Sequence, residues 1–169
     1  MKYNSKIHNL KKAEKGIGLV EILIVIAVIA VGFLAIISFL IFSRGVTFQV
    51  ARNTRATSLA EEDTEAIRAM RDESWSSNIA TLTFGTTYYP VISGDKWTLT
   101  TTNPGLIDNL YTRTVVVENV GRDANGNIVA SGGTNDPKTK KVTSTVSWTE
   151  DGRNKQVVLT TYIGDFLGN

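Results

Sequence analysis

The sequence contains no cysteine, and its only histidine is His8. The absence of cysteine excludes disulfide bonds, thiol nucleophiles and cysteine-based metal sites. Removal of the basic segment that holds His8 would also leave the chain without the histidine that Ser–His and Cys–His catalysis require. The sequence has no pair of acidic residues at a distinctive catalytic spacing and no phosphate-binding loop. We therefore expect a protein that is not an enzyme.

Acidic residues are scarce in the first 16 residues, where five lysines accompany a single acid, Glu14. This segment carries a net charge of +4, whereas the whole chain carries +2, so the remainder carries −2. The basic character of the chain thus belongs to its N-terminal segment alone. Nucleic-acid binding by the rest of the chain is not indicated.

Charge is nearly absent from the next 26 residues, 17–42, where Glu21 is the only ionisable residue and Ser38 the only other strongly polar one. A helix of this length measures about 39 Å at about 1.5 Å per residue, and about 20 apolar residues span a bilayer core. The run is too long for an ordinary secretory signal, and no A-x-A cleavage site ends it. The lysines before it predict a single-pass protein of the cytoplasmic membrane, with a cytoplasmic N-terminus and an extracytoplasmic remainder.

Glu21 needs an explanation, because an ionised carboxylate near membrane depth is costly unless it is paired. One interpretation places it at the membrane edge, where it reaches water. The other is a cut between Gly16 and Ile17, which gives Ile17 a new α-amino cation. The two charges then lie four residues apart on one helix face, and the amine can pair with Glu21 of the same chain or of a neighbour. Pairing between chains would favour one axial stagger and set the register of an assembly.

The stretch "KGIGLVEILIVIAVIAVG" resembles the class III signal peptides of type IV prepilins and type II secretion pseudopilins. The matching features are the lysine-rich leader ending in Gly16, then Leu19, Val20 and Glu21, then an unbroken apolar run. The continuation "AVGFLAIISF" is closer to minor pilins and pseudopilins than to major pilins, many of which carry a proline where this chain has Ser38. The first mature residue is commonly Phe in the family, and here it is Ile17.

This resemblance implies cleavage after Gly16 by a prepilin peptidase and N-methylation of Ile17. It also implies partners: other pilin subunits in a homo- or heteropolymer, an assembly platform and motor, and membrane lipid before assembly. The expected division of the chain is a leader (1–16), a transmembrane and filament-core helix (17–42), an amphipathic helix (43–75) and a globular head (76–169).

The segment 43–75 contains one glycine and no proline. Its apolar residues recur at three- and four-residue spacings, which is typical of one face of a helix: Ala56, Leu59, Ala60, Ala66, Ile67 and Met70. Charged residues, Asp63 among them, fill the other positions. We interpret them as a solvated face with local ion pairs such as Glu65 with Arg68; the alternative is contact with neighbouring subunits of a filament. The two segments together predict one helix from Ile17 to about Trp75.

Residues 76–169 change to a β-rich composition with frequent turn signals. We predict strands at 95–102, 111–120, 140–150 and 155–164. In the third, Val142, Val146 and Trp148 alternate with Thr143, Thr145 and Ser147, which is typical of a sheet with one buried and one wet face. Asp151-Gly152 predicts a hairpin between the last two strands. The apolar stripe of 56–70 is the natural cover for the buried face, so the expected fold class is α+β: a long N-terminal helix packed against a small antiparallel β-sheet head.

Asp123, Asn125 and Asn127 stand at alternate positions, as the first ligands of a calcium loop do. Twelve positions counted from Asp123 end at Thr134 rather than at a glutamate, although Asp136 lies nearby. The alternative, which we favour, is a hairpin turn around Asn125-Gly126. Apart from this calcium hypothesis, we expect no cofactor. Residues 130–141 are predicted to form a surface loop, and the three tryptophans are expected in the core or at its edge: Trp75, Trp97 and Trp148.

The leading functional hypothesis is a pilin-like structural subunit that assembles through its N-terminal helix into a type IV pilus or pseudopilus filament, at the cell surface or in the periplasm. The alternative is a monomeric, membrane-anchored extracytoplasmic binding module. The sequence leaves open whether the subunit is major or minor, and whether it serves a pilus, DNA uptake or secretion.

Overall fold

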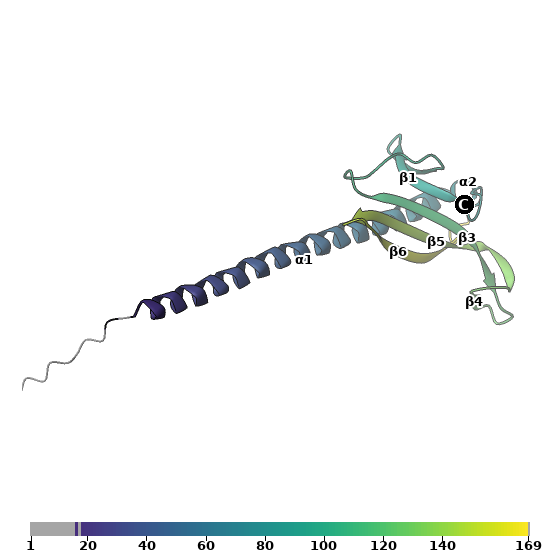
Figure 1. Cartoon of the computed structure of the whole chain (residues 1–169). Helices are drawn as coiled ribbons and strands as arrows, with labels where there is room; N and C mark the ends of the chain where they lie inside the picture. The colour runs from purple at the N-terminus through teal and green to yellow at the C-terminus, as the bar shows by residue number, and fades with distance from the viewer. Residues whose placement is uncertain (1–15, 17, 169) are drawn as a thin grey trace, which may run out of the picture. The chain divides into compact units, whose positions relative to one another are not determined.

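The computed structural model describes Gly16 and residues 18–168. The chain divides into two compact units, Met1–Thr47 and Phe48–Asn169, and each is described by itself (Figure 1). Helix α1 (Leu19–Glu73) supplies all of the first unit from Leu19 onward and the first part of the second. The predicted helix is thus confirmed from Leu19 to Glu73, and its expected first residue, Ile17, lies outside the described residues.

Helix α1 ends at Glu73 because the next residue caps a second helix, α2 (Trp75–Asn78). Ser74 is extended, with φ −166°, and its Oγ accepts a hydrogen bond from the Ser77 amide at 3.3 Å. Such side-chain capping replaces the backbone partners that a helix start lacks. The expected end at about Trp75 agrees with this boundary to within two residues. Trp75 itself is the first residue of α2, where its side chain is buried.

The second unit contains a six-stranded antiparallel sheet in the order β2-β1-β3-β5-β6, with β4 paired to β3. Its strands are β1 (Thr87–Ser93), β2 (Lys96–Thr100), β3 (Thr112–Arg122), β4 (Ile128–Val129), β5 (Thr134–Glu150) and β6 (Arg153–Gly164). Figure 1 shows the second part of α1 lying across one side of this sheet. The α+β fold is confirmed, with the long helix packed against a small antiparallel sheet.

The hydrophobic core lies between α1 and the sheet, as the two sequence periods predict. All six residues of the stripe are buried: Ala56, Leu59, Ala60, Ala66, Ile67 and Met70. They pack against alternate residues of β3 and β5, among them Val115, Val117, Val142 and Val146. Trp148 is buried next to Tyr111, whose ring centroid lies 5.7 Å away in an edge-to-face arrangement.

Strand β1 is absent from the sequence-based prediction, and Pro90 at its centre explains the omission. Proline lacks the amide hydrogen that a paired strand donates, so it is normally confined to edges. Here β1 pairs with β3 only at Thr87 and Tyr88, whereas Pro90 faces Leu99 of β2. Pro90 therefore has a paired neighbour on one side only, and its missing amide is tolerated.

The predicted surface loop 130–141 is wrong over most of its length, because β5 already begins at Thr134. The register against β3 shifts between Asn119, which faces Lys140, and Val120, which faces Asp136. Pro137 lies in the stretch that this irregularity leaves without partners on β3, so the strand continues past it. The hairpin at Asp151-Gly152 is confirmed: both residues have positive φ, 50° and 71°, as a two-residue turn of the primed type requires.

Candidate functional site

The residues predicted to direct processing and assembly lie at the start of the described chain. Gly16 is exposed and outside any regular element, Ile17 lies outside the described residues, and Glu21 occupies the first turn of α1. The Glu21 amide donates to the Gly18 carbonyl at 3.0 Å, so Glu21 is already held in helical geometry. Its side chain is exposed and has no ion-pair or hydrogen-bond partner among the described residues.

The surface that follows Glu21 is apolar and open on all sides. Every residue from Leu19 to Phe42 is exposed, and one 18-residue window of the helix reaches a mean hydropathy of 3.2 with none of it buried. The other polar side chain of this stretch, Ser38, donates its hydroxyl to the Leu34 carbonyl at 2.9 Å and so needs no external partner. Glu21 is thus the one ionisable side chain between Leu19 and Phe42, and no described residue pairs with it. The helix is long and apolar enough to cross a membrane as a single span.

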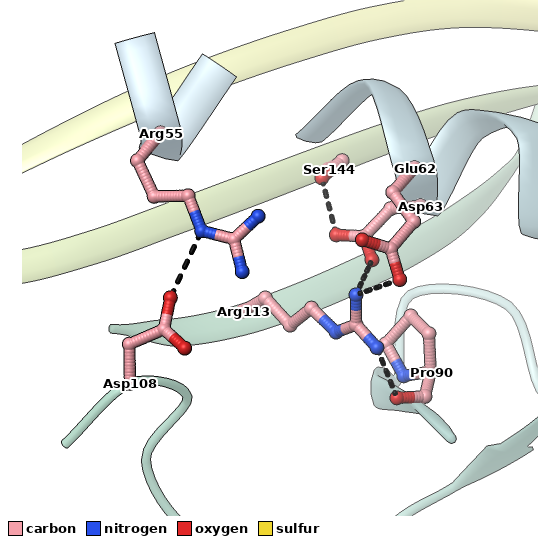
Figure 2. Close-up of polar contacts among 7 residues, drawn as sticks. All are labelled: Arg55, Glu62, Asp63, Pro90, Asp108, Arg113 and Ser144. Carbon is pink, nitrogen blue, oxygen red and sulfur yellow. Dashed lines mark hydrogen bonds and ion pairs between the residues drawn. The ribbon is translucent and has the colours of Figure 1, made fainter. Parts of the chain in front are cut away.

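A buried polar cluster lies in the second unit, where α1 meets the sheet (Figure 2). Arg113 of β3 is its centre: Nη1 lies 3.1 Å from Glu62 and 3.4 Å from Asp63, both on α1. Nη2 donates to the Pro90 carbonyl of β1 at 3.3 Å, and the guanidinium lies 5.3 Å from the centre of the Trp97 ring. One planar cation therefore links the helix to three strands of the sheet.

Asp63 is fully buried within this cluster. Its Oδ2 accepts a hydrogen bond from Ser144 of β5 at 2.8 Å, whereas Oδ1 has only the longer ionic contact with Arg113 and no hydrogen bond. Burial raises the pKa of Asp63 to about 6, against the lowering effects of Ser144 and Arg113. The assignment of Asp63 to a solvated helix face was wrong.

The sequence did contain the signal that places Asp63 inside. Position 63 lies at the centre of the stripe, four residues after Leu59 and four before Ile67. Arg113, Val115 and Val117 likewise occupy every second position of β3, so all three lie on its inner face. An acid within the apolar stripe of a helix and a base among the apolar residues of the facing strand together predict a buried ion pair between helix and sheet.

A second ion pair in Figure 2 connects α1 to the loop between β2 and β3. Arg55 Nε donates to Asp108 Oδ2 at 2.9 Å, and this hydrogen bond raises the pKa of Arg55. Nearby, the Tyr111 hydroxyl donates to the Arg52 carbonyl at 3.2 Å. These contacts fix the loop to the helix. The predicted exposed pair of Glu65 with Arg68 is also present.

The calcium candidates form the turn that was the favoured alternative. Asp123 Oδ1 accepts from the amides of Asn125 and Asn127 at 2.9 and 2.8 Å, and Oδ2 accepts from the Asn127 side chain at 3.1 Å. These hydrogen bonds, chiefly those from Asn127, lower the pKa of Asp123. The turn joins β3 to β4, which pair at Gly121 with Val129.

Asp136, the remaining acid near that turn, is engaged elsewhere. Its carboxylate accepts from Arg122 Nε at 2.7 Å, and this contact is the main reason that its pKa falls to about 2. Within the described residues no group of three or more His, Cys, Asp and Glu side chains is placed to hold a metal ion. Calcium binding at Asp123, Asn125 and Asn127 stays a hypothesis that these contacts do not favour.

Comparisons with protein-family models, with curated proteins and with solved structures found no match.

Proposed function

We propose that the chain is a pilin-like structural subunit that is inserted in the cytoplasmic membrane, processed after Gly16 and assembled through its N-terminal helix into a type IV pilus or pseudopilus filament. The observation that carries this proposal is one carboxylate, Glu21, which has no partner among the described residues. It stands in the first turn of a helix whose other side chains as far as Phe42 are either apolar or, in Ser38, satisfied internally.

The exposed apolar helix has two environments that suit it, lipid and other apolar helices. In a bilayer, association of helices depends on packing and on polar contacts rather than on the hydrophobic effect. An unpaired carboxylate is costly in either environment. An α-amino cation on Ile17 of a neighbouring subunit would satisfy it, and it would do so at one axial stagger only. The pair would therefore select the correctly placed incoming subunit.

The partners of this proposal follow from the resemblance of residues 11–42 to prepilins. A prepilin peptidase would cut after Gly16, and an assembly platform and motor would move subunits from the membrane to the filament. The protein would perform no chemistry of its own.

The test is a Glu21→Ala substitution in the full chain expressed in its host. We expect membrane insertion and cleavage after Gly16 to continue, because the leader and the apolar run are unchanged. Incorporation into filaments should fall by about tenfold or more, as expected for the loss of a charge-assisted hydrogen bond of about 1.5–3 kcal/mol. The measurement is the amount of subunit in sheared filaments relative to the membrane fraction.

Ser38→Ala is the matched control, because it removes the other polar side chain of the same run, one that is satisfied within its own helix. It should incorporate normally. Normal incorporation of the Glu21→Ala protein would contradict the pairing role. A native chain that retains residues 1–16 would instead support the membrane-anchored binding module.

A further inference from the structure

Strand β6 forms one edge of the sheet, so one side of its backbone has no neighbouring strand. It has twelve residues, whereas β2 at the opposite edge has five. Proteins usually protect a long edge with charged residues, proline or a bulge, because an open edge can pair with another chain. From Gln156 to Gly164, β6 contains no charged residue and no proline, and its register against β5 is continuous. This edge therefore lacks the usual protection.

The pairing with β5 shows which backbone groups of β6 point to the open edge. The Asp165 amide donates to the Lys138 carbonyl at 2.8 Å, directly after the pair of Gly164 with Thr139. In an antiparallel pair, residues that bond to the neighbouring strand alternate with residues whose N–H and C=O groups point away. The odd-numbered residues of β6 therefore bond to β5. The even-numbered ones are exposed and direct their amides and carbonyls outward: Gln156, Val158, Thr160 and Tyr162.

An opening of about 200 Å³ lies between this edge and the part of α1 that covers the sheet. Residues 159–161 of β6 line one side, and the α1 side carries Glu61, Glu65 and Arg68. The opening is smaller than the roughly 300–1,000 Å³ of small-molecule sites, so it suits one side chain of a larger ligand. In a strand paired with β6, every second side chain would project toward α1 and so toward this opening.

The α1 side of the opening is acidic. Glu65 is paired with Arg68 at 2.5 Å, whereas Glu61 is exposed and no described residue pairs with it. Residues 156–164 of β6 contribute no charge. A lysine or arginine side chain in the opening would therefore place its cation near the Glu61 carboxylate and its aliphatic stem against Leu159.

We propose that the open edge of β6, from Gln156 to Tyr162, binds an extended segment of another protein as an additional strand, with a lysine or arginine of that segment beside Glu61. The ligand that matches a row of alternating amides and carbonyls is an extended polypeptide backbone, as in other cases of strand addition. The acidic opening adds a preference for a basic side chain. This activity is additional to filament assembly and does not depend on it.

A second copy of the chain fits this edge less well. Antiparallel pairing of β6 with the β6 of another copy would be a two-fold symmetric contact. It would reverse the direction of α1 in that copy, which does not suit two chains inserted in one membrane through this helix. The partner is therefore a different polypeptide, and pairing between copies is an outcome that the experiment distinguishes.

The test uses the full chain in detergent micelles and a blocked hexapeptide, Lys-Val-Thr-Val-Thr-Lys, as the probe. Valine and threonine favour the extended state, and one of the two lysines faces α1 in either orientation of the strand. Binding is followed by hydrogen–deuterium exchange of backbone amides in NMR spectra. We expect excess peptide to slow exchange at Val158 and Thr160 by about tenfold. Leu159 and Thr161, whose amides already bond to β5, should change little.

Two further peptides separate the backbone contribution from the charge contribution. The same hexapeptide with N-methyl groups on its four central residues cannot donate to β6, so it should not slow exchange at Val158 and Thr160. A hexapeptide with glutamate in place of both lysines should bind about two- to fivefold more weakly than the original, the factor expected for an exposed charge pair.

Variants of the protein test the same two contributions. Thr160→Pro removes one outward amide and no bond to β5, so it should weaken binding by about tenfold. Thr160→Val, which keeps the amide, is its control. Glu61→Gln should abolish the preference for the lysine peptide over the glutamate peptide. Asp95→Asn, the same change of charge in the turn between β1 and β2, should leave that preference intact. The N-methylated peptide tests the backbone contribution on the unmodified protein, whatever Thr160→Pro does to folding.

Four results would overturn the proposal. They are unchanged exchange at Val158 and Thr160 with excess peptide, equal slowing by the N-methylated peptide, an equal effect of Glu61→Gln and Asp95→Asn on the peptide preference, and slow exchange that depends on protein concentration without any peptide. The last would show that the edge is occupied by a second copy. None of them would bear on incorporation of the subunit into filaments.

Discussion

The protonation state of Asp63 depends on opposing effects of burial and of its polar neighbours on its pKa. Burial disfavours its charged form, and Ser144 and Arg113 only partly compensate, so its pKa rises from 3.8 to about 6. The folded state therefore binds a proton more readily than the unfolded state between these two values. It follows that the contribution of Asp63 to stability increases as the pH falls through about 6 and is lost as the pH rises above it.

We predict that the free energy of unfolding increases by roughly 1 kcal/mol between about pH 7.5 and pH 5 through Asp63 alone. Asp63→Asn should remove this increase, because the amide keeps an acceptor for Ser144 but does not titrate. Asp136, with a pKa of about 2, titrates below this range and does not interfere. The measurement is urea unfolding of the full chain in detergent at several pH values.

Glu65→Gln serves as the control for this titration, because Glu65 is an exposed carboxylate on the same helix, 67% accessible. Its pH dependence should match that of the unmodified protein. Equal slopes for the Asp63→Asn and unmodified proteins would show that Asp63 does not carry the effect.

At the scale of elements, α1 depends on different surroundings along its length. Its residues up to Phe42 have no cover among the described residues, whereas the stripe from Ala56 to Met70 is buried against the sheet. Ile67 is wholly buried and belongs to the same core cluster as Val115 and Val142. The second part of the helix is thus stabilised by tertiary packing, as short amphipathic segments generally are.

We predict that Ile67→Ala destabilises the head by about 2–5 kcal/mol, the usual cost of a cavity in a packed core. Ile92→Ala, at a position that is 66% exposed on β1, should change stability by less than about 0.5 kcal/mol. Both values come from urea unfolding followed by near-ultraviolet circular dichroism. Similar costs at the two positions would contradict the assignment of the core.

The sequence predicts those elements in which apolar residues recur at one regular spacing, either that of a helix or that of a strand. The stripe of α1 and the alternation of Val142, Val146 and Trp148 each follow from burial of one face, and the structure confirms both. Strand β1 and the start of β5 could not be predicted in this way, because Pro90 and Pro137 interrupt them and are tolerated only through local pairing.

The candidate sites were predictable to different degrees. Glu21 is conspicuous because it is the only ionisable residue between Ile17 and Phe42. The contact of Arg55 with Asp108 could not be predicted, since it depends on a loop in which Asp108 and Asn109 both have positive φ. Asp63 was predicted in solvent because charged residues of a helix are usually exposed, but its spacing of four residues from both Leu59 and Ile67 places it on the buried stripe.

In the whole molecule, the two units differ in how far their apolar surface is buried within the chain itself. The second unit, Phe48–Asn169, has its own core and buried ion pair, whereas the described part of the first presents an apolar helix with one unpartnered acid. We infer that the first unit is completed by other molecules. In the proposed filament those molecules are further copies or related subunits, and the group that reaches Glu21 is an amine created by proteolysis.

The most direct measurement of this claim is the intact mass of the protein recovered from sheared filaments of its host. Pairing of Glu21 with a new α-amine predicts a single N-terminus at Ile17, with or without one added methyl group, in material that is polymerised. A chain that still begins at Met1, or a protein found only as a monomer in the membrane while filaments form without it, would rule out this pairing.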